Sequence, residues 1–172
     1  MLVQKSFSLA HLDSMPANLL EEILLLIKSN IPGGKDAREL LFKSKFILTE
    51  LLTNAIKHAN THEVKLDIEI KDGVVKFEKQ DYGNPLILPK VKTDQFENAV
   101  IVTTDVMHTL YAVEKDGITY FHCHENTVPF IDTENDFPEH FGLLIITKAA
   151  DEFSYQYNTE NNLNTFTATV SI

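Results

Sequence analysis

Three polar side chains follow one another along an otherwise apolar segment between Phe46 and Ala59. Glu50, Asn54 and Lys57 are spaced by four and three residues, so in a helix their Cβ atoms lie roughly 5–6 Å apart on one side. A carboxylate can orient or deprotonate a hydroxyl or water, an amide oxygen can bind Mg²⁺, and an ammonium can neutralise phosphate. The row therefore predicts a site for a magnesium-bound phosphate. The alternative is a solvated helix face whose charges form an ordinary ion pair.

The elements around this row have to position it. The remaining residues of the segment form a broad apolar arc at helical spacing, which predicts a helix packed on a sheet: Leu48, Leu51, Leu52, Ala55, Ile56 and Ala59. We expect this helix to run from about Asp36 to Asn60, after a shorter apolar helix that ends at Pro32-Gly33-Gly34. No Gly-Lys-Ser/Thr follows these glycines, which excludes a P-loop.

A predicted β-hairpin comes next in the chain. Apolar and polar residues alternate over 64–70 and 74–80, and the turn signal Lys71-Asp72-Gly73 separates the two runs. The hairpin delivers Asp81 to a strand end, where Gly83 allows a ligand to approach the backbone closely. The alternative for Asp81-x-Gly83 is a plain turn. Near the C-terminus, Gly142 opens another predicted helix, and alternation over 153–157 and 166–172 predicts a terminal hairpin.

Taken in order, these motifs resemble those of the Bergerat-fold ATPases, which include gyrase, MutL and the histidine-kinase ATP domains. Glu-x-x-x-Asn-Ala-x-Lys-His from Glu50 resembles the N box, and Asp-x-Gly-x-Pro from Asp81 and Gly-Leu-x-x-Ile from Gly142 resemble the two glycine boxes. The closer resemblance is to the stand-alone anti-sigma-factor serine kinases, whose last strand is similar to Asn164-Thr165-Phe166. It covers residues 46–81 and 140–172 well and the interval between them poorly.

The resemblance implies a fold and a function. The fold would be an α/β two-layer sandwich, with a mixed, mostly antiparallel sheet of about five strands and three helices on one face. ATP and Mg²⁺ would lie between the 36–60 helix and a lid. Implied roles are catalytic base for Glu50, Mg²⁺ ligand for Asn54, and nucleotide contacts for Lys57, Asp81 (adenine), Gly83, Gly142 and Thr165. The protein would be an ATP-binding regulatory serine/threonine kinase or ATPase, acting on a sigma factor or an anti-anti-sigma-like substrate, with a homodimer as one assembly.

The chain departs from the family pattern at both glycine boxes. His140 occupies a position where the second box usually has a glycine, and the first box lacks its second glycine. A side chain at His140 either contacts phosphate when protonated or blocks closure around it. The second hypothesis is therefore a non-enzymatic protein-interaction module on a degenerate Bergerat fold, with weak or no ATP turnover.

The interval 86–139 corresponds to the nucleotide lid and is longer than expected. Alternating runs on either side of Asp116-Gly117 predict a second hairpin, which we interpret as an insertion in or beside the lid. A third hypothesis is a metal site formed by His122 and His124, which His108 joins only if the register of the hairpin allows it. The alternative is that these histidines lie on the surface or are partly packed. A two-residue loop would send His108 to the other face of the hairpin, whereas a three-residue loop would set it opposite His124.

The length and composition of the chain restrict the classes of protein to which it can belong. The 172 residues suit a single domain. The net charge of −10 without a basic cluster argues against nucleic-acid binding. Cys123 is the only cysteine, which precludes an intrachain disulfide. No apolar run has signal-peptide character or membrane-spanning length, so we expect a cytoplasmic protein.

Overall fold

The computed structural model describes residues 2–10, 14–16, 18–58, 63–88, 99–126 and 140–172. Within these residues the chain forms three helices and eight strands, in the order β1 (Leu2–Ala10), α1 (Leu19–Asn30), α2 (Lys35–His58), β2 (Glu63–Lys71), β3 (Val74–Asp81), β4 (Ala99–Thr104), β5 (His108–Lys115), β6 (Ile118–Glu125), α3 (Phe141–Ala149), β7 (Glu152–Asn158) and β8 (Leu163–Ser171).

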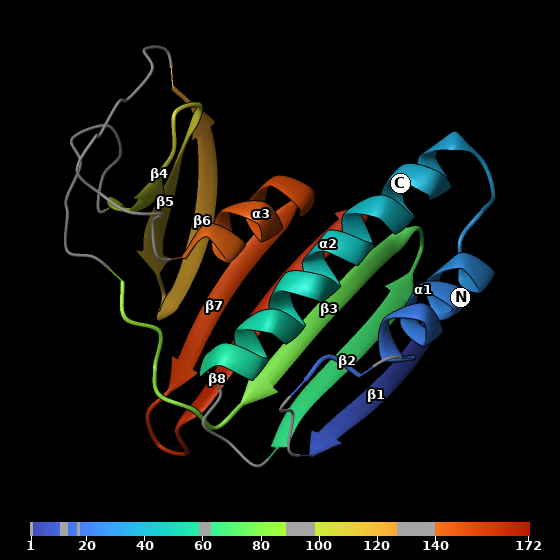
Figure 1. Cartoon of the computed structure of the whole chain (residues 1–172), viewed down its shortest axis with the longest axis horizontal. Coiled ribbons are helices and arrows are strands. Elements are labelled where there is room, and N and C mark those ends of the chain that lie inside the picture. The colour runs from blue at the N-terminus through green and yellow to red at the C-terminus, as the bar shows by residue number, and fades with distance from the viewer. Residues whose placement is uncertain (1, 11–13, 17, 59–62, 89–98, 127–139) are drawn as a thin grey trace.

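The molecule has two layers, with all three described helices on one face of a single sheet (Figure 1). The strand order is β1-β2-β3-β8-β7-β6-β5-β4. The predicted α/β two-layer sandwich is confirmed. The predicted sheet was wrong in two details: the described sheet has eight strands where about five were expected, and every pair in it is antiparallel.

Both predicted Asp-Gly hairpins are confirmed. Asp72 and Gly73 have φ of 51° and 83°, and Asp116 and Gly117 have φ of 54° and 76°. Two successive residues in the left-handed region form the two-residue turn whose twist matches that of antiparallel strands. The second turn pairs Lys115 with Ile118, so the hairpin has the two-residue loop.

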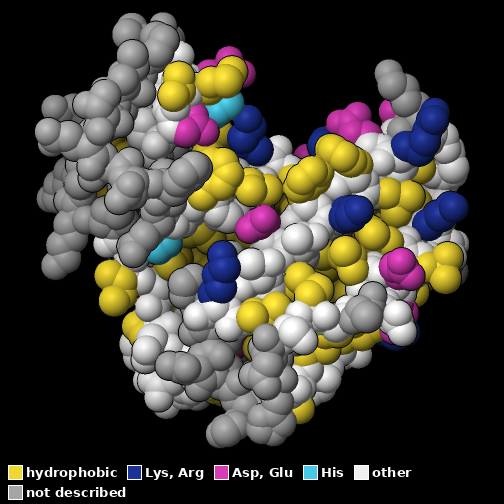
Figure 2. Space-filling view, viewed as in Figure 1, with side chains coloured by type: hydrophobic (Ala, Val, Ile, Leu, Met, Phe, Trp, Pro, Cys, Tyr) yellow, Lys and Arg dark blue, Asp and Glu magenta, His cyan; other side chains and the backbone are white. Residues whose placement is uncertain are grey.

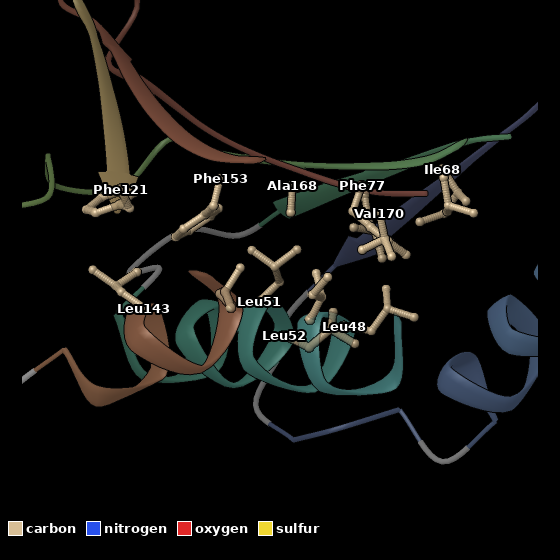
Figure 3. Close-up of a cluster of buried hydrophobic side chains, with 14 of the residues drawn as sticks. Leu48, Leu51, Leu52, Ile68, Phe77, Phe121, Leu143, Phe153, Ala168 and Val170 are labelled. Carbon is tan, nitrogen blue, oxygen red and sulfur yellow. The ribbon is translucent and has the colours of Figure 1, made fainter. Parts of the chain in front are cut away.

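The core lies between α2 and the sheet. Leu48, Leu51 and Leu52 are no more than 1% exposed and face Phe77 and Val170 on the strands (Figure 3). Burying each leucine contributes about 1.5–3 kcal/mol, so this side of α2 is firmly held on the sheet. The polar row on α2 must therefore point away from the sheet. The predicted apolar arc is confirmed up to Ile56, which is half-buried, while Ala59 lies outside the described residues.

The insertion predicted at 86–139 extends the sheet. Its described part contains β4, β5 and β6, and β6 joins β7 through three registered pairs, from Ile118 opposite Gln156 to Tyr120 opposite Ser154. These strands continue the sheet beyond β7, at the far side from β1 (Figure 1). The described part of the expected lid is therefore sheet, and residues 89–98 and 127–139 lie outside the description.

Charged side chains are scattered over the helical face. Figure 2 shows Lys and Arg side chains distributed singly among Asp, Glu and apolar residues on the described part of this face. None of the described helices is both long enough and apolar enough to cross a membrane.

Candidate functional site

The polar row of α2 lies on the side of the helix that faces α3. Glu50 and Asn54 are half-buried, and Lys57 is exposed at the end of the row. Partial burial raises the pKa of the Glu50 carboxyl above its ordinary value, and the Lys57 ammonium partly opposes this rise. Glu50 and Lys57 are seven residues apart, two turns along the same side of the helix.

Gly142 brings the start of α3 onto this row. A Cβ atom on Gly142 would lie 2.6 Å from Oε2 of Glu50 and 3.4 Å from Oδ1 of Asn54. Cβ atoms essentially never approach other heavy atoms closer than 3.0 Å, so any larger residue would displace the Glu50 side chain. Glu50, Asn54 and Gly142, which are far apart in the sequence, therefore meet at one place.

His140 precedes α3 with a backbone conformation that favours glycine. Its φ of 76° and ψ of 15° lie in the left-handed region, which costs a residue with a Cβ on the order of 1 kcal/mol or more. Its carbonyl accepts a hydrogen bond from the Leu143 N–H at 2.9 Å, which closes the first turn. The chain thus keeps the glycine-type backbone at this position while carrying an imidazole.

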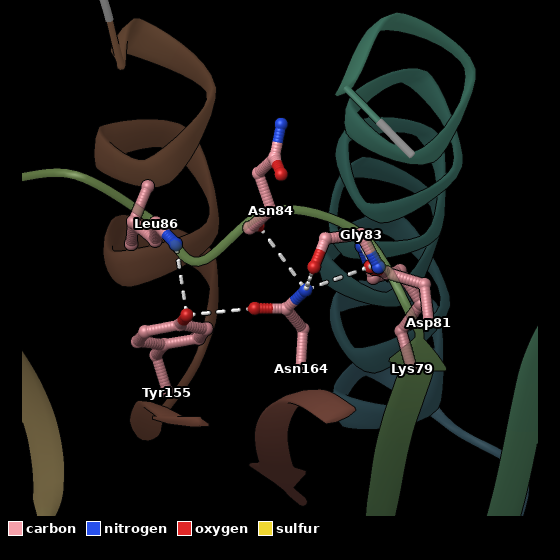
Figure 4. A network of polar contacts seen from close by, with 7 residues as sticks. All are labelled: Lys79, Asp81, Gly83, Asn84, Leu86, Tyr155 and Asn164. Atoms are coloured by element: carbon pink, nitrogen blue, oxygen red, sulfur yellow. Dashed lines mark hydrogen bonds and ion pairs between the residues drawn. The ribbon is translucent and has the colours of Figure 1, made fainter. Parts of the chain in front are cut away.

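Asp81 lies at the end of β3, and its carboxylate accepts hydrogen bonds from neighbouring groups of the same chain (Figure 4). Its Oδ2 is 2.6 Å from the Lys79 ammonium. Its Oδ1 accepts hydrogen bonds from the Asn164 amide and from the Gly83 N–H, both at 3.0 Å. Asp81, Lys79 and Asn164 are only 4%, 3% and 2% exposed. Burial lowers the pKa of Lys79, and the Asp81 carboxylate opposes this effect.

Asn164 links this carboxylate to the segment that follows β3. Its amide also donates to the carbonyls of Gly83 and Asn84, at 3.1 and 3.2 Å. Its carbonyl accepts from the Tyr155 hydroxyl at 2.7 Å, and that hydroxyl accepts from the Leu86 N–H at 2.8 Å. Residues 83–86 are therefore held against β7 and β8 by a continuous polar network (Figure 4).

Thr165 is not brought to this group. It pairs with Gln80, while its neighbour Asn164 pairs with Asp81. Successive strand residues point to opposite faces, so Thr165 faces away from the helices and Asn164 takes the inward position. The sequence reasoning missed Lys79 and Asn164. A signal was present, because the β3 alternation that turns Phe77 inward also turns Lys79 inward, two residues before Asp81.

A family model described as the histidine kinase-like ATPase domain matches residues 35–169, from the start of α2 into β8. The chain belongs to this family. A search of the curated proteins finds no match to it.

As a histidine kinase-like ATPase domain, the chain has the fold that supports an ATP-binding regulatory function. The match includes the polar row of α2, Asp81 and Gly142. It also includes the β4–β6 insertion, so the family assignment covers the part of the chain in which the resemblance was weakest.

The two ends of the candidate site fit Mg-ATP differently. The carboxylate, amide and ammonium at the α2–α3 contact suit a magnesium-bound phosphate. The described residues contain no group of three or more His, Cys, Asp or Glu that could hold a metal ion, so Mg²⁺ would take most of its ligands from phosphate and water, as is usual for this ion. The adenine end does not fit as predicted, because Asp81 already accepts from Lys79, Asn164 and Gly83.

The histidines of the β5–β6 hairpin belong to no group of three or more potential metal ligands among the described residues. Thr109 pairs with His124, which puts His108 on the other face of the hairpin from His122 and His124. His108 instead lies 2.9 Å from the Lys148 ammonium and 3.5 Å from Asp105. The two-residue turn is the physical reason that the three-histidine hypothesis was wrong.

Proposed function

We propose that this histidine kinase-like ATPase domain is a regulatory protein that binds Mg-ATP through its phosphates at the contact between α2 and α3. The observation that carries the proposal is the position of Gly142, where an added Cβ would lie 2.6 Å from the Glu50 carboxylate and 3.4 Å from the Asn54 amide oxygen. This close approach joins the N box to the second glycine box at the first turn of α3, where backbone N–H groups favour anions.

Each residue of the contact has a distinct proposed role. Asn54 would supply an oxygen ligand to Mg²⁺, and Lys57 would form charge-assisted hydrogen bonds to phosphate. Bound Mg²⁺ would supply charge neutralisation on the phosphate oxygens. Glu50 would orient and deprotonate the attacking hydroxyl or water, and the rise of its pKa on burial makes the carboxylate a stronger base for this role.

The finer function rests on resemblance. The N-box sequence is similar to that of the anti-sigma-factor serine kinases, so we propose transfer of phosphate to a serine or threonine of a protein partner. By the same resemblance the partner would be a sigma factor or an anti-anti-sigma-like protein, met in the cytoplasm by a monomer or homodimer of this chain. Fold alone does not specify such a partner.

Calorimetric titration with Mg-ATP tests the phosphate site. We expect Asn54→Ala and Lys57→Met to weaken binding by at least about tenfold each, which corresponds to about 1.4 kcal/mol. Lys43→Met is the matched control, because Lys43 lies on the same helix in an exposed pair with Glu39 and should leave the affinity unchanged. Equal affinities in all three variants would contradict the proposed site.

A second candidate function is the non-enzymatic interaction module, and the network around Asp81 favours it. Lys79 and Asn164 enclose the Asp81 carboxylate, and a histidine replaces a glycine at the second glycine box. Both features favour binding of a partner without hydrolysis of ATP. A phosphate-release assay beside a partner-binding assay separates the two. Tight partner binding without phosphate release, unchanged by Glu50→Ala, supports the module, whereas release that Glu50→Gln abolishes and Glu39→Gln preserves supports the enzyme.

A further inference from the structure

We infer that Lys79 and Asn164 reserve the Asp81 carboxylate for internal bonds, so that this chain does not select adenine and binds nucleoside triphosphates with different bases alike. The inference about selectivity rests on the proposed phosphate site. Its structural part, the internal use of Asp81, stands on the contacts alone.

The first step is the inventory of acceptor positions on Asp81. An ionised carboxylate offers about four lone-pair positions on two oxygens. Lys79 takes one on Oδ2, and Asn164 and Gly83 take two on Oδ1. One position on Oδ2 is left, but Asp81 is only 4% exposed, so an exocyclic amino group could reach it only if one of the groups around the carboxylate moved aside.

The second step concerns which donor could be displaced. The Lys79 ammonium is itself buried, 2.6 Å from Asp81 and 4.4 Å above the centre of the Phe166 ring. Separating this pair would leave the buried Lys79 ammonium without its carboxylate, which costs far more than one neutral hydrogen bond returns. The ammonium already performs towards Asp81 the role that an adenine amino group would perform.

The third step concerns Asn164. Its amide group donates to Asp81 and to two backbone carbonyls, while its oxygen accepts from Tyr155. Rotating this side chain to admit a ligand would break all of these bonds at once and would release the segment through Leu86 that Tyr155 also holds. Buried polar groups in such a network are costly to leave unpaired.

A nucleotide would then be held through its phosphates, and its base would contribute little. Titrations of the wild-type protein with Mg-ATP, Mg-GTP and Mg-ITP test this directly, because inosine lacks the exocyclic amine of adenine. We expect affinities within about threefold of one another, with Mg-tripolyphosphate also bound. ATP binding more than tenfold tighter than ITP binding, with a preference that Asp81→Asn removes and Asp67→Asn keeps, would overturn the inference.

Thermal unfolding tests the internal pair without any nucleotide. Breaking a buried ion pair in a protein of this size should lower Tm by roughly 10 °C in Lys79→Met and in Asp81→Asn. The double variant should recover at least half of that loss, because neither charge is then left unpaired. Lys76→Met is the control, since Lys76 lies on the same strand in a more exposed pair with Glu78 and should change Tm little.

The outcomes separate the inference from the proposed function. Recovery in the double variant without binding of any triphosphate supports the internal pair and overturns the proposed phosphate site. Strong adenine selectivity that depends on Asp81 supports the proposed nucleotide site and overturns the inference that Asp81 is reserved for internal bonds. If the single variants lower Tm only slightly, and the double variant lowers it by the sum of the two changes, the inference of an internal pair is overturned. If the single variants are insoluble and the double variant is soluble, this shows the same coupling as a recovery of Tm. If no variant folds, the affinities of the wild-type protein for Mg-ATP and Mg-ITP still decide whether it selects adenine.

Discussion

Gly142 is constrained by a side chain from another helix, because its Cα faces the Glu50 carboxylate. We expect Gly142→Ala to lower the free energy of unfolding by about 0.5–1 kcal/mol in urea denaturation, below the usual range for overpacking, because the Glu50 carboxylate that a Cβ would meet ends a side chain that can rotate away. Gly33→Ala is the control, because a Cβ there would meet nothing within 4 Å and should cost less than about 0.5 kcal/mol. Equal effects at the two glycines would contradict the close approach.

The same contact can be tested by compensation. If the cost of Gly142→Ala comes from Glu50, then shortening Glu50 to alanine in the same chain should remove most of it. The double-mutant cycle should give a coupling of about 0.5 kcal/mol, at the low end of the range for residues in contact. Additive losses would mean that the cost of the alanine arises elsewhere.

His140 allows the backbone and the side chain to be tested separately. His140→Ala removes the imidazole and its contacts but keeps a Cβ at φ 76°, whereas His140→Gly also relieves the left-handed conformation. We expect the glycine variant to be more stable than the alanine variant by about 1 kcal/mol in urea denaturation. At the exposed strand position His122 the order should reverse, because glycine weakens a strand.

Lys79 and Asn164 show why the site was only partly predicted. Glu50, Asn54 and Lys57 could be placed together because helical spacing alone fixes their relation. The internal hydrogen bonds of Asp81 could not be predicted, because its partner Asn164 lies 83 residues away in the sequence and meets it only through the pairing of β3 with β8. The alternation of β3 could have identified Lys79 as an inward-facing lysine, but the sequence does not show which carboxylate it meets.

At the scale of elements, the β4–β6 unit is attached more weakly than the strands beneath α2. Three registered pairs join β6 to β7, whereas eight join β3 to β8. We expect native-state hydrogen exchange to show amides of β6 opening at a lower free energy than those of β3 and β8, because local opening there breaks fewer contacts. Equally slow exchange in β6 and β3 would contradict a separable unit.

The elements differ in how far their own sequences determine them. Both Asp-Gly hairpins were predictable, because alternation and left-handed turn residues are local signals. β4 was not, since a register shift between Ile101 and Thr103 interrupts it and its burial does not alternate. The joining of β6 to β7 also escaped prediction, because no local pattern specifies which edge of a sheet a hairpin will extend.

At the scale of the whole molecule, the charge of −10 opposes the binding of an anion. ATP without a metal should therefore bind at least about tenfold more weakly than Mg-ATP when Mg²⁺ is removed with EDTA in calorimetric titrations. Raising the salt from about 0.05 M to about 0.5 M should narrow the difference, since screening weakens the repulsion between exposed charges. Metal-independent affinity would show that Asn54 does not act through Mg²⁺.

The buried Lys79–Asp81 pair also limits how the sequence can change over evolutionary time. Replacing either residue alone leaves an unpaired charge in the interior. A lineage that replaces one of them must therefore pass through a less stable protein or replace both together. Descendants of this chain should therefore keep lysine and aspartate as a unit or lose them as a unit. Two positions separated by a single residue are thus inherited as one character.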